Sequence, residues 1–151
     1  MPYTFDEAIA LARLPGMTPW ESALLQAWIT TAGRHWDTYD FNVRLGGGVD
    51  PGPAFTPAIR AGSIANTQPR ADCIATRDNT IAVVEVKIQG YLGSLGQILA
   101  YEQLYRHDHP TVMQVERVLV AHHLAAEVAR VLSANHVIVF VFPGVQPPAP
   151  A

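Results

Sequence analysis

The side chains best suited to chemistry lie on two segments that the sequence predicts to pair as a β-hairpin. The apolar run of residues 81–88 has the length and the β-branched content of a buried strand. Because side chains alternate across a strand, Glu85 and Lys87 point to one face while the valines and isoleucine between and after them point to the other. One face is therefore expected in the core, and the other carries an acid and a base two residues apart.

A third charged side chain is expected opposite Glu85. Residues 70–76 read as the preceding strand, and the Arg-Asp-Asn-Thr between the two strands is turn chemistry. If Arg77 pairs with Thr80, the register puts Asp72 directly opposite Glu85, whereas a three-residue loop would shift it by one. Directly opposed residues have β-carbons about 5 Å apart, and like charges placed so are destabilising. Two facing carboxylates therefore predict a cation between them.

The alternative is that Glu85 and Lys87 are ordinary polar residues of an exposed strand face, with Asp72 a solvated neighbour. Lys87 is the only lysine among ten basic residues, so background lysine use does not explain its position. A helix also follows at a suitable distance. Apolar residues at steps of three and four predict it over residues 92–106, with Gln97 and Tyr101 four apart on one face.

Asp72, then Glu85-Val86-Lys87, then a helix bearing Gln97 and Tyr101 resembles the PD-(D/E)XK nuclease superfamily, in its branches with a Q-x-x-x-Y helix. Small single-domain members from tailed bacteriophages are similar. The resemblance covers residues 40–143, and its one departure is Ala71 where many members have proline before the first acid.

The resemblance implies a Mg²⁺- or Mn²⁺-dependent deoxyribonuclease. It implies that Asp72, Glu85 and the Val86 backbone carbonyl bind the metal ion. Lys87 would orient or deprotonate the attacking water and stabilise charge on the phosphate, and Gln97 would position Lys87 or a water. Tyr101 would support the phosphate. It also implies a location in the cytoplasm, that of the host if a phage encodes the chain, or in the virion.

Contacts with DNA are expected from a locally basic segment. The net charge is −3, whereas proteins that bind phosphates usually carry a basic patch. Between residues 41 and 77, however, four arginines outnumber two aspartates; these are Arg44, Arg60, Arg70 and Arg77.

The N-terminal half is expected to supply two helices, a strand and a long loop. Helical spacing over residues 4–14 ends at Pro15-Gly16, and Thr18-Pro19 begins a second helix that runs to about Ala32. Glu21 completes a capping box there, or it joins the metal site as an acid of the first core helix does in related families. Residues 39–45 alternate as a strand. The Gly/Pro-rich residues 46–69 are expected to be either a flap over nucleic acid or a floppy connector.

Beyond the central helix we expect a strand over residues 115–122, a helix over 124–134 and a strand over 136–142, joined by a right-handed parallel crossover. The fold class is therefore α/β, with a restriction-endonuclease-like core in the order α-β-β-β-α-β plus a further α-β and a mixed sheet flanked by helices. The His-Asp-His of residues 107–109 is expected to be a solvated helix end, with a second metal site as the alternative.

Length and composition bound the class of protein. A chain of 151 residues, 49% hydrophobic and 15% charged, fits a single globular domain over residues 1–143 with a proline-rich tail over 144–151. One cysteine excludes an internal disulfide. We expect Cys73 to be buried, because it lies on the other face of its strand from Asp72. No apolar stretch approaches the ~20 residues of a membrane span, and we expect no signal peptide. The alternatives kept open are a homodimeric junction resolvase and a catalytically silent virion or interaction protein that keeps the fold.

Overall fold

The computed structural model describes residues 1–32 and 35–149. Along these residues the order of elements is α1 (Phe5–Ala10), α2 (Pro19–Ala32), β1 (Thr38–Arg44), α3 (Pro57–Thr67), β2 (Arg70–Arg77), β3 (Thr80–Gln89), α4 (Leu92–Asp108), β4 (Gln114–His123), α5 (Ala126–Ala134) and β5 (Val137–Val141).

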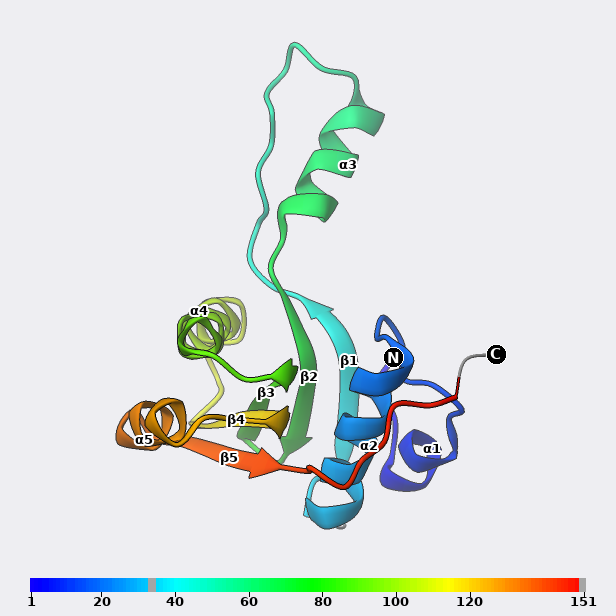
Figure 1. Cartoon of the computed structure of the whole chain (residues 1–151). Helices are drawn as coiled ribbons and strands as arrows, with labels where there is room; N and C mark the ends of the chain where they lie inside the picture. Colours follow the sequence, from blue (N-terminus) through cyan, green and yellow to red (C-terminus); the bar gives the residue numbers. More distant parts are fainter. Residues whose placement is uncertain (33–34, 150–151) are drawn as a thin grey trace.

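The strands form one mixed sheet in the order β1-β2-β3-β4-β5. β2 pairs antiparallel with β1 and with β3, and β4 and β5 each lie parallel to the preceding strand. In Figure 1, α1 and α2 lie on one side of the sheet and α4 and α5 on the other. The predicted α/β class is confirmed: a central mixed sheet flanked by helices, compatible with a restriction-endonuclease-like core.

The two faces of the sheet have separate apolar cores. Leu24, Leu25 and Trp28 of α2 pack on the face that carries Cys73 and Val84. The opposite face packs against the central helix, where Tyr101 of α4 lies with β2 and β3 residues. A further cluster under α5 contains Ile98, Leu119 and Leu132 and completes this layer. Since the alternate side chains of β3 enter two different cores, the strand is buried almost throughout its length.

The hairpin register agrees with the sequence prediction. Arg77 pairs with Thr80, and the ladder continues to Cys73 opposite Val84. Cys73 is fully buried on the face of α2, as expected from its place in the alternation. The first helix was predicted too long. It ends at Ala10, Leu11 has an extended backbone, and the chain then enters the core at Leu14.

Residues 46–69 are not the irregular loop predicted from their glycine and proline content. They form an arm that projects from the sheet, and its returning limb is the helix α3 (Figure 1). Thr56 caps that helix through a bond from the Ile59 N–H, and Pro57 occupies its first turn. The same Thr-Pro signal had correctly placed the start of α2, so the signal for α3 was present in the sequence.

Polar bonds, not an apolar core, hold the arm together. Within the described part of the chain, α3 has no buried residue. The Ser63 hydroxyl donates to the Val49 carbonyl at 2.9 Å, and the Val49 N–H donates to the Thr67 hydroxyl at 2.6 Å. Gly48 approaches the helix so closely, at a φ of +65°, that a β-carbon there would overlap the Ile64 carbonyl oxygen. The arm therefore consists of two chain segments joined by hydrogen bonds, and their close packing depends on Gly48.

Buried charge fixes α4 against the sheet. Glu102 is buried in α4 and accepts from Arg106 on the same helix and from Arg117 of β4. Arg117 also donates to the Asn135 carbonyl at the end of α5, at 2.8 Å. Because a desolvated carboxylate needs its partners, this network sets the position of α4 relative to β4 and α5. Across residues 1–32 and 35–149, none of the helices combines the length and apolar character required to cross a bilayer.

Replacing Gly48 with alanine should loosen the arm while leaving the sheet intact. A left-handed backbone costs a residue with a side chain about 1–2 kcal/mol, so we expect α3 amides to exchange hydrogen about 5- to 30-fold faster. Hydrogen exchange resolved along the chain measures this. Gly47→Ala is the matched control, because a β-carbon there meets nothing within 4 Å. Equal protection of α3 in both variants would contradict the dependence of the arm on the close contact at Gly48.

Candidate active site

The ladders on both sides of β2 are interrupted at Asp72. Phe41 pairs with Cys73 and Val43 with Ala71, but the pair between them is absent from the ladder of the described strands. Asn42, which would complete it, has a φ of +55°. On the other side, the pairing of β2 with β3 stops at Cys73. The strands therefore part at Asp72, which opens space for a side chain within the sheet.

The Asp72 carboxylate occupies this opening. Its Oδ2 accepts from the Val86 backbone N–H at 2.7 Å, so a side-chain oxygen takes the place of a strand carbonyl. An ionised acceptor bound to a backbone N–H makes a strong, short hydrogen bond. This bond locks Asp72 against the Glu85-Val86-Lys87 segment of β3.

Glu85 and Lys87 form an ion pair beside Asp72. Lys87 Nζ lies 2.7 Å from Glu85 Oε1, with the lysine side chain 25% exposed and the glutamate 3% exposed. Lys87 thus places one positive charge beside the paired carboxylates. Glu85 Oε2, however, is buried and accepts no hydrogen bond from the described residues. When Glu85 is protonated, its carboxyl group shares a hydrogen bond with Asp72. Leaving a charged oxygen without a partner is costly, so Oε2 is an acceptor available to a ligand.

Burial and mutual repulsion shift the protonation of the two acids. Burial, followed by the charge of Asp72, raises the pKa of Glu85 to about 7, despite the opposing bond to Lys87. The pKa of Asp72 is also raised, chiefly by burial and in part by Glu21, against the Val86 N–H. The pKa of Lys87 is raised although burial opposes it, because Glu85 and Asp72 favour its charged form. Lys87 is therefore held as an ammonium between two acids that compete for protons.

A hydrogen-bonded chain from α4 borders the ion pair. Gln97 Nε2 donates to the Tyr101 hydroxyl at 3.4 Å, and its Oε1 accepts from the Tyr91 hydroxyl at 3.3 Å. Burial, with the charges of Glu85 and Asp72 added, raises the pKa of Tyr101 to about 12. The helix predicted to carry Gln97 and Tyr101 thus brings both beside the acids. Sequence reasoning missed Tyr91, whose signal was its place just before that helix.

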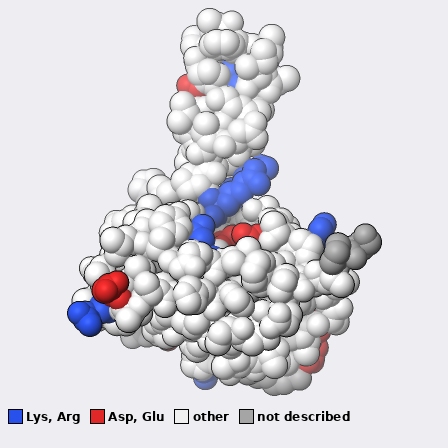
Figure 2. All heavy atoms as spheres, in the orientation of Figure 1, with Lys and Arg blue, Asp and Glu red and all other residues white. Residues whose placement is uncertain are grey.

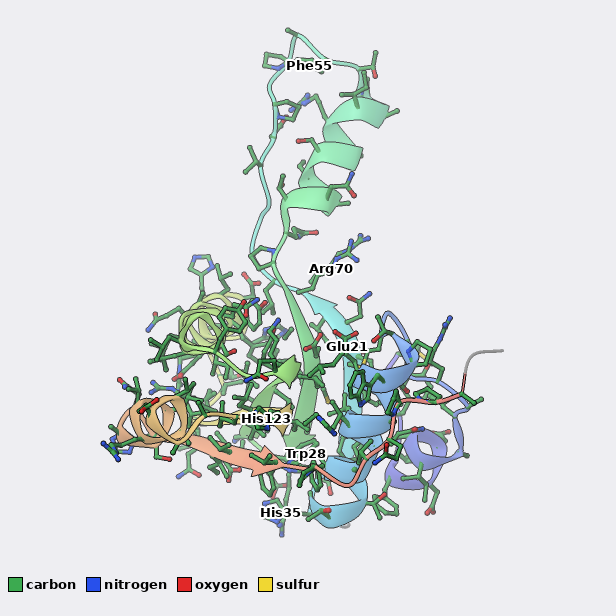
Figure 3. The ribbon with its side chains drawn as sticks, in the orientation of Figure 1. Glu21, Trp28, His35, Phe55, Arg70 and His123 are labelled. Carbon is green, nitrogen blue, oxygen red and sulfur yellow. The ribbon has the colours of Figure 1, made fainter. Side chains whose placement is uncertain are left out.

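Glu21 lies at the same end of the sheet, on α2. Its Oε2 accepts from the Thr18 backbone N–H at 3.0 Å and from the Thr18 hydroxyl at 2.7 Å, which confirms the predicted capping box. Its charge also contributes to the raised pKa of Asp72. Figure 3 shows Glu21 near the root of the arm, on the side of the sheet covered by α2. The cap and the proximity to Asp72 therefore coexist.

The four arginines expected at a nucleic-acid surface separate into three groups. Arg44 and Arg70 are direct cross-strand partners, both exposed, at the root of the arm. Figure 2 shows basic atoms there, bordering a hollow with acidic atoms, and Figure 3 places Arg70 at that root. Arg60 lies out on α3 and is paired with Asp50, at 2.9 Å. Arg77 lies at the opposite end of β2, near His35. Only Arg44 and Arg70 therefore flank the acids.

The donor set suits a hard divalent cation in part. Two carboxylates meet, and one of their oxygens is buried without a partner, which fits an oxygen-preferring ion such as Mg²⁺. No group of three or more His, Cys, Asp or Glu arranged to hold a metal occurs in the described residues. The His-Asp-His of residues 107–109 is a helix end: Asp108 accepts from the Gly46 N–H, and His109 stacks on Tyr105.

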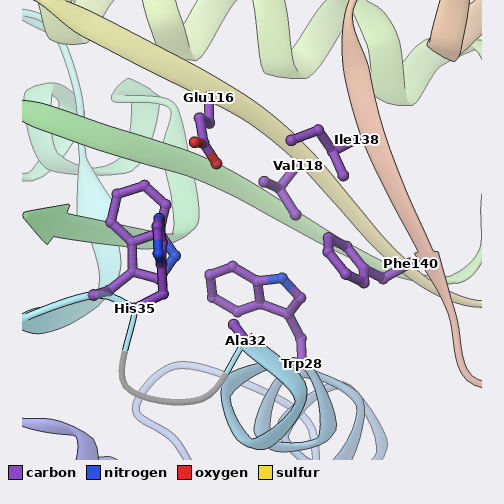
Figure 4. Close-up of a pocket in the computed structure, with 8 residues that line it drawn as sticks. Trp28, Ala32, His35, Glu116, Val118, Ile138 and Phe140 are labelled. Atoms are coloured by element: carbon purple, nitrogen blue, oxygen red, sulfur yellow. The ribbon is translucent and has the colours of Figure 1, made fainter.

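Two hollows lie at the other end of the sheet. One, of about 170 Å³, has aromatic walls that include Trp28, Trp36 and Phe140 (Figure 4). The other, of about 270 Å³, is polar and includes Arg77 and Asp78. Neither is lined by the paired acids, so the hollows and the candidate active site are separate features.

Comparison with known proteins gives two distant likenesses. No family model and no curated protein matches the chain. A solved repair endonuclease from Pyrococcus abyssi is 20% identical with a TM-score of 0.42, over 52% of this chain and 34% of that one. A solved protein of unknown function is 12% identical with a TM-score of 0.47, over 81% and 57%. The chain thus spans about a third and just over half of these two proteins.

Replacing Glu85 with glutamine should stabilise the protein at neutral to basic pH when a chelator is present. The folded state holds the Glu85 proton up to about pH 7, and an ordinary glutamate titrates near 4.5. The free energy of unfolding should therefore fall by up to about 3 kcal/mol as the pH rises through this window. Glu85→Gln removes that loss, so its melting temperature should exceed that of the parent protein at pH 8 but not at pH 4.

Thermal melts across pH measure this effect, with the exposed Glu127→Gln as control. A lower melting temperature for Glu85→Gln at pH 8 would mean that the ion pair with Lys87 outweighs the burial of the charge.

Proposed function

We propose that this protein is a metal-dependent nuclease that hydrolyses phosphodiester bonds of DNA. The observation that carries the proposal is the convergence of Asp72, Glu85 and Lys87 where β2 and β3 part, with one Glu85 oxygen buried and without a hydrogen-bond donor among the described residues. A core gains nothing from two buried acids and an orphan oxygen, because each raises the cost of folding. Such a cost is typical of a site that awaits a ligand.

Asp72 and Glu85 would hold Mg²⁺ or Mn²⁺, with the Val86 carbonyl as a further ligand and Glu21 as a neighbouring acid. A bound divalent ion polarises the scissile phosphate and lowers the pKa of a coordinated water. The Asp72 carboxylate stays oriented because its Oδ2 is already fixed by the Val86 N–H. Glu85 Oε2 gains the partner that it lacks among the described residues.

Lys87 would act on the attacking water and on the phosphate. Its side chain is a quarter exposed, so it can face substrate while it remains bonded to Glu85. A fixed cation placed where negative charge develops lowers the barrier without reorganisation. Gln97 and Tyr101 would orient water or phosphate through the hydroxyl and amide groups that they already share. Lys87 is better suited to position the water than to remove its proton. Although burial lowers the pKa of Lys87, Glu85 and Asp72 raise it further, so the side chain keeps its own proton.

A nucleic acid is the proposed class of substrate because a like-charged pair borders the site. Arg44 and Arg70 face each other across β1 and β2, and like charges so placed repel. A backbone phosphate between them would remove that repulsion. Arg70 is two residues from Asp72 on β2, about 7 Å along a strand, so the phosphate would be close to the scissile one.

A catalytically silent interaction protein is the second candidate. The net charge of −3 and the projecting arm, whose two charged residues neutralise each other, favour it. A metal-induced rise in melting temperature separates the two, because a site kept for catalysis binds Mn²⁺ and a purely structural remnant does not.

Removing either key side chain should abolish cleavage without unfolding the chain. We expect Lys87→Ala and Asp72→Asn each to slow Mn²⁺-dependent cleavage by about 100-fold or more, because the first removes a cation placed where negative charge develops and the second removes a charged ligand of the metal ion. Cleavage of linear, circular single-stranded and branched DNA with Mg²⁺, Mn²⁺ or EDTA measures this. Asp78→Asn is the matched control: it is the same change at the far end of the same hairpin, where asparagine suits the φ of +51°.

Parent-like cleavage by folded Asp72→Asn would remove the acid from the mechanism. If neither the parent protein nor any variant cleaves DNA and Mn²⁺ leaves the melting temperature unchanged, the interaction protein becomes the better proposal.

Removing Arg44 or Arg70 should weaken binding to every DNA sequence. Each substitution by alanine should lower the slope of log affinity against log salt by about 1, as expected for one lost phosphate contact. Binding titrations in EDTA over a range of salt concentrations measure the slope. Arg77→Ala is the control on the same strand, and an equal loss there would place the phosphate path at the other end of the sheet.

A further inference from the structure

Tyr91 is a large exposed side chain at the rim of the candidate active site. It is 49% exposed, and the following Leu92 is 59% exposed. Neither belongs to the apolar clusters of the described residues. Packing therefore does not explain why these two side chains are exposed, one of them, Tyr91, beside Lys87.

The Tyr91 ring is nevertheless held in place. Its hydroxyl donates to Gln97 Oε1 at 3.3 Å, and Lys87 Nζ lies 5.9 Å from the ring centroid. The ring also rests on Gly93, where a β-carbon would overlap it. Because these three contacts already hold the exposed ring, it loses little further conformational entropy when a ligand binds. A flat ligand can therefore stack on it at low cost.

The scarcity of positive charge makes such a contact useful to a nuclease. The chain has a net charge of −3 and one lysine, and of its four predicted DNA-binding arginines only Arg44 and Arg70 flank the acids. Phosphate contacts alone would give weak, strongly salt-dependent binding. Stacking of a base on an aromatic ring contributes about 1–3 kcal/mol and depends little on charge or sequence.

We propose that Tyr91 stacks on an unpaired base next to the phosphodiester held by Lys87, so that the substrate is single-stranded at that position. This inference rests on the proposed nuclease function and narrows its substrate class. The short distance from Lys87 Nζ to the ring means that a nucleotide whose phosphate contacts Lys87 has its base within reach of Tyr91. In the interior of a duplex both faces of each base are covered by stacked neighbours, whereas an unpaired base can leave the stack and offer a free face.

Fluorescence anisotropy with a labelled single strand and a blunt duplex of the same sequence tests the proposal. Titrations in EDTA exclude cleavage and keep the readout independent of catalysis. We expect the parent protein to bind the single strand more tightly, and Tyr91→Ala to weaken that binding about 5- to 100-fold with little effect on the duplex. Tyr91→Phe should stay within about twofold, because it keeps the ring face and loses only the bond to Gln97.

Two further variants keep the test decisive. Phe55→Ala removes a comparably exposed ring at the tip of the arm (Figure 3) and should leave single-strand binding unchanged. Gly93→Ala displaces the Tyr91 ring within a helix that alanine favours, so it should weaken binding even if Tyr91→Ala folds poorly.

The outcomes separate this inference from the proposed function. Binding that depends on Tyr91 without cleavage in Mg²⁺ or Mn²⁺ supports the stacking site and overturns the nuclease. Cleavage of duplex that is indifferent to Tyr91→Ala supports the nuclease and overturns the stacking site. Equal single-strand binding by the parent protein, Tyr91→Ala and Gly93→Ala, or no binding by any of them, also overturns it.

Discussion

The organisation of this molecule depends on a carboxylate that replaces a strand carbonyl. Asp72 bonds to the Val86 N–H at the point where β2 leaves its regular pairing with β3. The bond holds one acid against a second, Glu85, in a place from which water is largely excluded, and burial raises the pKa of both acids. Lys87 offsets part of the repulsion, and one Glu85 oxygen still accepts no hydrogen bond from the described residues. The free-energy cost of burying these charged groups is therefore concentrated at a single point of the sheet.

The surroundings of this point are rigid for different physical reasons. The sheet is fixed by two apolar cores, one on each face. The helix α4 is fixed by a buried carboxylate, Glu102, which ties it to β4, and through Arg117 to the end of α5. The arm is fixed by hydrogen bonds and a close glycine contact, with no buried residue in its described helix. The site is thus set on firm elements, while the arm that projects from the sheet is the least supported by burial.

The low positive charge of the chain concentrates the electrostatics in a small region. Arg44 and Arg70 lie at the root of the arm, Lys87 is paired with Glu85 beside Asp72, and Arg60 is neutralised by Asp50. A protein arranged in this way cannot depend on a broad basic surface to hold nucleic acid. Local geometry, including a fixed aromatic ring at the rim, has to contribute what charge does not.

The sequence by itself determined the strands, the main helices and the hairpin register, because apolar periodicity and turn residues act locally and agree with the fold. That register was enough to bring Asp72, Glu85 and Lys87 together. Only the tertiary structure decided the parting of the strands at Asp72 and the exposure of Tyr91, because these depend on contacts between distant segments. It also decided that residues 46–69 form an arm: their glycines and prolines masked a capped helix that no core position marks.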